Sequence, residues 1–536
     1  TLLATATRAV LRFDEAHRAW SHDRRRRYLL SGPDLSLVLK HQGQFSWGED
    51  EADKKRFLRL SIRRRAVRRV LVATSLVAAL IGGAEIKAWL GQRELSLQFA
   101  SWGMPRDLGE HLGQLEKLTI SPSVTSLSWL SKAEKIRSLS VNAQLSTNVK
   151  LPGHLEEFTC KCSGAGRIFL NPSLRSLKLD APLDPVLPAN LRELSLSHWP
   201  RHFPPGLTSL RVVLNRLSEP ADPLPAHLQS LTLVSGSFDD FPSSWAGLLP
   251  RKLKNLSLQH VDLSASGSLS WLPSDLDSLN LSFPIRHSIN SLPLNLKSLS
   301  VDGLSTNLSG NLPPNLSSLS LRINKLQDLD FGHLQHLETL KLESRPFQKA
   351  DMLLIVPAQL RSLAASPEIL QGLRLPTGLK ELRVLPNPIN DIYFGNLPRG
   401  LESLDLQGHR FDWSILPPHL RSLRISLLGQ ANGFHLPQDL RSLTLQDLGP
   451  HELPLLESLP PRLLSLSLSG AAPLELGKLP RGLRELDISK LETPIYKNLQ
   501  GLPDHLEILT LRPYSVESLQ GLPKSVKELQ FTGEIF

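Results

Sequence analysis

The sequence has few cysteines and few aromatic residues. Of 536 residues, two are cysteines, four are tyrosines, and aromatic side chains make up only 6% of the chain. Cys160 and Cys162 alone cannot build the disulfide framework typical of small secreted proteins. They also have no second cysteine pair or histidine at metal-ligand spacing, so no metal site is expected. Hydrophobic residues still amount to 40% of the chain, so leucine must supply most of the core.

Excess charge is absent from most of the chain. The formal net charge is +10, but residues 1–93 contain 19 Lys and Arg against 9 Asp and Glu, which accounts for all of it. Residues 94–536 hold 42 residues of each sign. A groove that follows a phosphate backbone is therefore disfavoured, and no nucleic-acid partner is expected.

The chain contains only incomplete matches to catalytic motifs. "FDEAH" at 13–17 is similar to the acidic Mg²⁺ motif of helicases, but the chain has no phosphate-binding loop, so a charged helix with a solvated His17 is expected. "GAAPLELGK" at 470–478 separates its glycines by six residues, and Leu479 stands where Ser or Thr would bind Mg²⁺. We predict no enzyme activity and no cofactor, although a site assembled only in space stays an alternative.

A short phrase is repeated along the chain. "LPQDLRSLTL" at 436–445 returns as "LPANLRELSL" at 187 and "LPRGLRELDI" at 479, among others. Its core, L-x-x-L-x-L, occurs in 21 copies with a mean spacing of 20–21 residues, and 17 of them have a proline three residues before the first apolar position. Those first positions are 115, 136, 155, 174, 191, 207, 228, 253, 276, 296, 316, 337, 360, 379, 401, 420, 440, 463, 483, 506 and 526.

This spacing predicts a solenoid. Leu443 and Leu445 alternate with a period of two, so both face one side of a short strand, while Ser442 and Thr444 face the other. One such strand cannot bury its leucines, but stacked copies form a parallel sheet over a shared core. The return path has about ten residues and begins near a proline, which favours an extended chain with at most a turn of 3₁₀ helix. We expect a curved sheet over residues 94–536, with an arc on the order of 95 Å and open edges.

The unit "LPxxLxxLxL" resembles two classes of leucine-rich repeat. One is the short bacterial type found in effector ubiquitin ligases, and the other is the FNIP-type repeat. The match covers about residues 110–536 and implies a leucine-rich-repeat solenoid. The regular asparagine after the strand is missing, since Gln446 or Ser469 stands there. In those effectors the ligase activity belongs to a separate domain with a nucleophilic cysteine, so it is not expected of this chain.

The N-terminal region reads as a basic helical segment, residues 1–69, followed by a hydrophobic helix, residues 70–90. Residues 70–84 carry no charge. Five arginines precede them, and a tryptophan lies at the far end, as in membrane anchors. The sequence therefore predicts a single span of a bacterial inner membrane; the alternative is a helix that joins two domains of a cytoplasmic protein. The flanking basic residues are Arg63, Arg64, Arg65, Arg68 and Arg69.

The same region resembles the segment that follows the NTPase module of bacterial STAND proteins. The resemblance lies in "YLLSGPDLSLVLKHQ" (28–42) and "KKRFLRLSIRRRAVRRVLVATSLVAAL" (54–80), where Phe57, Leu58 and Ser61 match an F-L-x-x-S phrase. It implies a nucleotide switch upstream, with the solenoid as a membrane-associated recognition arm. The alternative is a soluble adaptor or effector without a switch domain.

The concave face is the default binding surface of a solenoid. Its first outward column is mostly serine, which supplies few anchors for a partner. The adjacent column is more varied, and we predict that it contacts a protein or another macromolecule. Loop tryptophans (Trp199, Trp245, Trp271 and Trp413) are competing anchors unless they pack in the core. The candidate binding residues are Lys178, Arg211, Lys341, Arg383, Asp405, Arg424 and Asp487.

Overall fold

The structure is a computed structural model that divides into two compact units, Thr1–Glu94 and Leu95–Phe536, each described by itself. It describes the backbone but not the side chains for residues 2–4, 44, 68–90, 243, 246, 288–289, 307–308, 371, 450 and 453. Outside the description lie residues 1, 24–28, 31, 45–46, 49, 146–147, 164–166, 181–184, 238–240, 242, 264–268, 283–287, 290–291, 304–306, 309–311, 323–330, 344–354, 372, 387–396, 407–415, 428–434, 493–494 and 534–536.

The first unit is helical. It contains α1 (Leu2–Asp23), α2 (Gly32–His41), a 3₁₀ turn at Gln42–Gln44 and the first part of α3 (Glu51–Ser101). Its core packs the rings of Phe13 and Phe57 edge to face, with centroids 5.6 Å apart. The hydroxyl of Ser61 accepts a hydrogen bond from the Leu30 amide at 3.1 Å and donates one to the Phe57 carbonyl at 3.0 Å. Two residues of the F-L-x-x-S phrase thus hold this core together.

His17 lies in the same core, so its expected solvation is wrong. Its side chain is 5% exposed, and its ring packs against that of Phe57 with centroids 5.5 Å apart. Nε2 lies 3.6 Å from a carboxylate oxygen of Asp53 on α3. A histidine four residues after Phe13 on α1 shares the buried face of that helix, which explains the burial.

Helix α3 is continuous where the sequence predicted a boundary at residue 70. The 51 residues from Glu51 to Ser101 form one helix, so the predicted hydrophobic helix is not a separate element. Arg63 and Arg64 are exposed, whereas the side chains of Arg68 and Arg69 lie outside the described residues, as do those of the predicted span. Among the parts of the chain that the structure describes, no helix has the length and apolar character needed to cross a membrane.

The second unit is built on one parallel sheet of 21 strands, so the predicted parallel solenoid is confirmed. Each strand begins two residues after a first apolar position of the repeat. The strands are β1 (Lys117–Val124), β2 (Ser138–Gln144), β4 (Glu157–Ser163), β6 (Ser176–Leu179), β7 (Glu193–Leu196), β8 (Ser209–Leu214), β9 (Ser230–Ser235), β10 (Asn255–Gln259), β11 (Ser278–Ser282), β13 (Ser298–Asp302), β15 (Ser318–Arg322), β16 (Thr339–Glu343), β17 (Ser362–Ala365), β18 (Glu381–Val384), β19 (Ser403–Leu406), β20 (Ser422–Ser426), β21 (Ser442–Leu448), β22 (Ser465–Gly470), β23 (Glu485–Leu491), β24 (Ile508–Leu511) and β25 (Glu528–Phe531).

The return segments carry little regular structure. Short helices are α4 (Leu108–His111), α5 (Pro367–Gln371) and α6 (Leu453–Glu457), and 3₁₀ turns lie at Ser128–Lys132, Ser243–Gly247, Pro450–Glu452 and Leu476–Lys478. Two small pairs of strands add β3 (Val149–Lys150) to β5 (Ile168–Phe169) and β12 (Ser288–Ile289) to β14 (Asn307–Leu308).

The repeated proline starts a tight turn that leads into each strand. The Pro437 carbonyl accepts a hydrogen bond from the Leu440 amide at 3.3 Å, and Pro503 and Leu506 make the same contact at 3.1 Å. A copy without the proline keeps the turn, since the Leu334 carbonyl accepts from Leu337 at 3.2 Å. The spacing of the leucine therefore sets the turn, and proline favours it by fixing φ.

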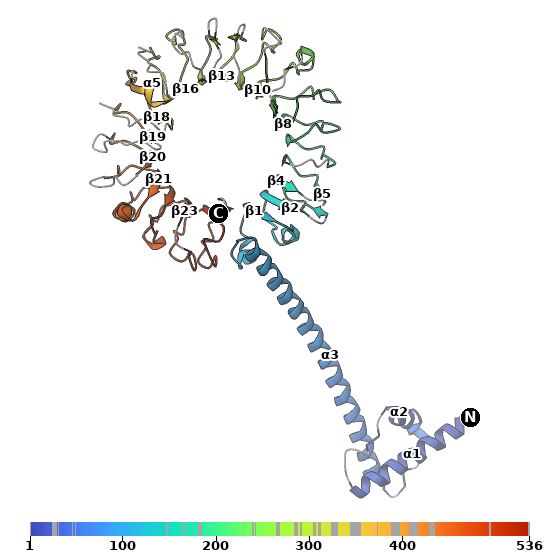
Figure 1. Cartoon of the computed structure of the whole chain (residues 1–536). Coiled ribbons are helices and arrows are strands. Elements are labelled where there is room, and N and C mark those ends of the chain that lie inside the picture. Colours follow the sequence, from blue (N-terminus) through green and yellow to red (C-terminus); the bar gives the residue numbers. More distant parts are fainter. Residues whose placement is uncertain are drawn as a thin grey trace. The chain divides into compact units, whose positions relative to one another are not determined.

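The sheet closes on itself, contrary to the expected arc with open edges. β1 pairs in parallel with β25 as well as with β2, with Lys117 opposite Glu528 and Ile120 opposite Phe531. Figure 1 shows the resulting ring, with the strands along its inner side and the return segments outside. A closed sheet of 21 strands turns by about 17° per repeat. The bulky buried rings of the outer segments, including Trp129, Trp245 and Phe331, widen the outer spacing as this curvature requires.

Residues just before β1 complete the closure, and we call this junction the seam. The Asp107 carboxylate accepts hydrogen bonds from the Ser518 hydroxyl at 2.6 Å and from the Leu519 amide at 2.9 Å. The Gly103 carbonyl accepts one from the Tyr514 amide at 2.7 Å. Gly103 has φ +77°, and a Cβ there would overlap the Tyr514 ring, so the position requires glycine.

Candidate functional site: the central opening and the rim

Closure of the ring turns the concave face into the wall of a central opening. Along each strand, leucines are buried and the alternating residues are exposed or half-buried, as in the pattern of β6, where Ser176 and Lys178 face away from the core. Since the strands lie on the inner side of the ring, these alternating residues line the opening (Figure 1). The predicted binding column therefore belongs to an enclosed surface.

The size of the opening follows from the strand count. Twenty-one strands about 4.8 Å apart make a circumference of about 100 Å and an inner diameter of about 30 Å between backbones. Small serine and threonine side chains leave a passage of about 20 Å. An α-helix with its side chains is about 10–12 Å wide, so one helix or an extended chain can enter, whereas a folded domain cannot.

The structure brings several of the predicted residues into ion pairs, either across adjacent strands or within one strand. Arg383 on β18 contacts Asp405 on β19, with Nε 3.3 Å from the carboxylate. Lys341 contacts Glu343 at 3.6 Å, and Arg322 joins that pair by approaching Glu343 at 3.3 Å and Asp302 at 3.5 Å. These pairs are half-exposed, so each contributes little to stability, but together they place two charged clusters on the wall.

Other residues of the column differ in their partners. Asp487 accepts hydrogen bonds from the Ser489 amide at 3.0 Å and hydroxyl at 2.7 Å, and from the Ser467 hydroxyl of the preceding coil at 3.3 Å. Lys178 and Arg211 are exposed, and among the described residues no carboxylate lies within 4 Å of either. Arg424 is half-buried on β20, next to Asp405 in the strand register. The most available cations are therefore Lys178 and Arg211.

The loop tryptophans pack in the core. Trp245 is fully buried, and Trp199 packs against it with ring centroids 5.9 Å apart. Trp271 stacks on Phe241 at 4.9 Å. Trp413 lies outside the described residues. The three described rings therefore pack on the outer side of the coils. They are not placed to act as anchors for a partner.

Cys160 and Cys162 are also core residues. Both are buried on the core-facing side of β4, 1% and 5% exposed, and their sulfur atoms are joined. The described residues contain no group of three His, Cys, Asp or Glu side chains that could hold a metal ion.

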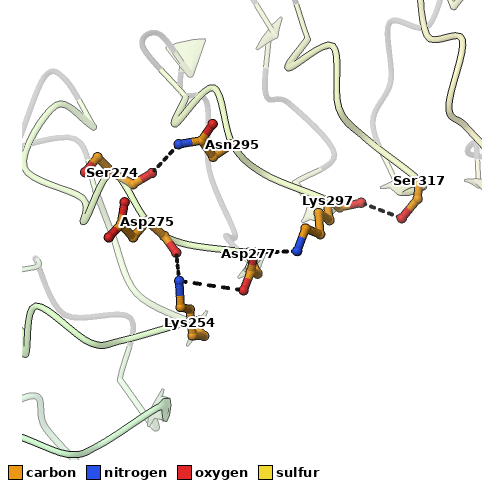
Figure 2. Close-up of polar contacts among 7 residues, drawn as sticks. All are labelled: Lys254, Ser274, Asp275, Asp277, Asn295, Lys297 and Ser317. Atoms are coloured by element: carbon orange, nitrogen blue, oxygen red, sulfur yellow. Dashed lines mark hydrogen bonds and ion pairs between the residues drawn. The ribbon is translucent and has the colours of Figure 1, made fainter.

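A second polar surface runs along one rim of the ring. We call it the rim row, and it consists of the residue immediately before each strand. Its backbone forms a ladder, since the Arg441 amide donates to the Arg421 carbonyl at 2.8 Å and equivalent bonds join the other coils. Figure 2 shows one section, where Asp277 contacts Lys297 at 3.0 Å and Lys254 at 4.0 Å. The row thus alternates in charge over this section.

One part of the rim forms a half-open polar pocket of about 430 Å³, which we call the rim groove. Lys380 contacts the Glu402 carboxylate at 3.0 Å and Arg421 contacts it at 3.3 Å, while Arg462 contacts Asp439 at 2.9 Å. The neighbouring Lys380, and to a smaller extent Arg421, lower the pKa of Glu402 below its usual value. The groove is lined by Lys380, Gly400, Glu402, His419, Arg421, Asp439, Arg441 and Arg462.

The rim groove was not predicted from the sequence, although aligning the repeats places Arg421 and Arg441 in the same position of consecutive copies. That position immediately precedes the strand and belongs to neither outward column.

The repeat length, the L-x-x-L-x-L register and the parallel sheet define the second unit as a leucine-rich-repeat solenoid. No protein-family model and no curated protein matches the chain. Solved structures of similar fold include the circular leucine-rich-repeat protein CroV588, with 17% identity, 78% of this chain and 82% of that chain covered, and a TM-score of 0.32. YopM from Yersinia enterocolitica is 20% identical over 82% and 100% of the chains, with a TM-score of 0.29. InlJ from Listeria monocytogenes is 15% identical over 75% and 76%, with a TM-score of 0.23.

Proposed function

We propose that the ring is a protein-binding module that takes a narrow segment of its partner, a helix or an extended chain, into the central opening. The observation that carries the proposal is the closure between β1 and β25, which makes the concave face reachable only through the opening. The wall is polar and mixed in charge, so it suits a polar polypeptide segment. Lys178 and Arg211 are exposed cations on this wall, and they favour acidic side chains on the partner.

A photo-crosslinking residue placed on the wall tests this proposal. Ser300, in the middle of β13, faces the opening, whereas Glu475 lies in an outer return segment and is 72% exposed. In cells producing the full chain, the Ser300 position is expected to form adducts with one polypeptide, which proteolysis and mass spectrometry would map to a single short segment. Adducts from the Glu475 position alone would contradict binding in the opening.

Removal of the available cations is a second test. The double substitution Lys178→Ala and Arg211→Ala is expected to weaken binding of the crosslinked segment by about tenfold, because two charge-assisted contacts are lost. Lys524→Ala removes an exposed cation from a return segment and is the matched control. Titration of a fluorescent peptide with the mapped sequence measures both. Equal affinities for the double variant and the control would place the contact elsewhere.

A finer hypothesis concerns the place of the ring in a larger protein. The resemblance of residues 28–42 and 54–80 to the segment after the NTPase of STAND proteins supports a role as the recognition arm of a membrane-associated signalling NTPase. A start codon close to the codon of Thr1 would favour the soluble adaptor instead. Membrane association through residues 70–90 is tested by fusing residues 60–95 to a soluble reporter. Full solubility of that fusion without detergent would remove the anchor.

A further inference from the structure

The rim groove contains more positive than negative charge. Four cations (Lys380, Arg421, Arg441 and Arg462) face two carboxylates, Glu402 and Asp439. Glu402 is shared between Lys380 and Arg421, and Asp439 is paired with Arg462. The groove therefore holds a local excess of two positive charges, although residues 94–536 as a whole are neutral.

Arg441 is the residue that these pairs leave without a counterion. Its neighbours in the rim row are Arg421 on one side and Leu464, 38% exposed, on the other. Within the part of the chain that the structure describes, no carboxylate lies within 4 Å of its guanidinium. Two guanidinium groups on consecutive coils thus stand beside a cavity with one of them unneutralised. Arg441 is exposed, so its guanidinium can donate to an anion that enters the groove.

We infer that the rim groove binds a small molecule that carries a phosphoryl group. A dianionic phosphate matches the excess of two charges, and guanidinium forks donate to phosphate oxygens in pairs. The cavity of about 430 Å³ is larger than a bare anion needs and lies in the range of small-molecule sites, so it has room for a substituent on the phosphate. This site is separate from the central opening, and its occupation does not depend on the proposed protein partner.

The first experiment measures binding of inorganic phosphate and of phenyl phosphate to the full chain by calorimetry, in chloride buffer of matched ionic strength. Saturable binding of both is expected, with the ester at least as tight because it fills more of the cavity. If chloride at the same concentration as the phosphate probe abolished binding of that probe, the groove would not be a phosphate site. Binding only to vesicles with phosphate headgroups, without binding of either soluble probe, would overturn it as well.

Two substitutions make the test specific. Arg441→Gln is expected to weaken phosphate binding by about tenfold, because a charge-assisted contact is lost. Glu402→Gln is expected to strengthen it, since Lys380 and Arg421 are then released from their shared carboxylate. If Arg441 and Glu402 only stabilised the fold, both substitutions would weaken phosphate binding. Opposite changes in affinity therefore indicate that the two side chains act on the bound phosphate.

The matched control is Arg192→Gln. Arg192 occupies the same position of the rim row, between Arg175 and Thr208, and lies outside the residues that line the groove. Its loss is expected to leave phosphate binding unchanged. Equal effects of Arg192→Gln and Arg441→Gln would show non-specific attraction to rim arginines and contradict the site.

Discussion

Replacement of Leu443 by alanine is expected to lower the free energy of unfolding by about 2–5 kcal/mol, the range for a buried leucine that leaves a cavity. Leu443 is fully buried and is the second residue of β21. It lies between Leu423 and Leu466 in the ladder of the sheet, so no neighbouring main chain can move in to fill the space. Chemical denaturation of the full chain, followed by circular dichroism, measures the loss.

The adjacent Ser442→Ala is the matched control. Ser442 starts the same strand but faces the central opening and is half-buried, so its substitution is expected to change stability by less than about 0.5 kcal/mol. The comparison tests which face of the strand is the core. Similar losses for the two variants would mean that the alternation of buried and open residues is wrong.

The strands were predictable because one short pattern determines them locally. L-x-x-L-x-L requires two alternating leucines on one side of a strand, and it can bury them only against a copy of itself. The turn before the strand needs only a residue whose carbonyl accepts from the leucine three positions later, which explains why Leu334 can replace proline there. The turn and the alternating leucines lie within ten residues of each other, so both can be predicted from a short stretch of sequence.

Closure of the ring was not predictable in the same way. It depends on the rotation between successive coils, which is set by how residues such as Trp245 and Phe331 pack on the outer side. An error of a few degrees per coil, summed over 21 coils, separates a ring from an open arc or a spiral. The seven candidate binding residues could be placed on one face from the sequence, but their enclosure in an opening could not.

The charged contacts were also predictable only in part. The pairing of Arg383 with Asp405 follows from their identical position in adjacent repeats, so an aligned sequence contains it. The rim groove also needs Arg462, which precedes the first apolar leucine of its repeat as Asp439 does in the preceding coil, so alignment of the repeats contains this pair too. The cavity between these side chains depends on their directions, which residue spacing alone does not determine.

Loss of the Asp107 carboxylate is expected to weaken the seam by about 2–3 kcal/mol, because it removes a charged acceptor and leaves the amide of the buried Leu519 without its partner. Asp107 lies more than 400 residues from Leu519 in sequence, so no local element replaces the contact. In Asp107→Ala the ring is expected to open between β1 and β25 while the other strand pairs stay intact, because closure depends on contacts made at that single junction.

Hydrogen exchange measures this opening directly. The amides of Glu116 and Lys117 donate to the Lys527 carbonyl across the seam, at 2.7 and 3.1 Å, and those of Arg441 and Ser442 make the equivalent bonds inside the sheet, at 2.8 and 3.0 Å. In Asp107→Ala the first pair should exchange about 10–100 times faster, while the second pair is unchanged. Asp504→Ala, an exposed carboxylate lost from a return segment, should alter neither pair. If Glu116 and Lys117 already exchange in the unaltered protein at the rate of unpaired amides, the sheet has open edges, and the enclosed opening proposed to bind a partner segment does not exist.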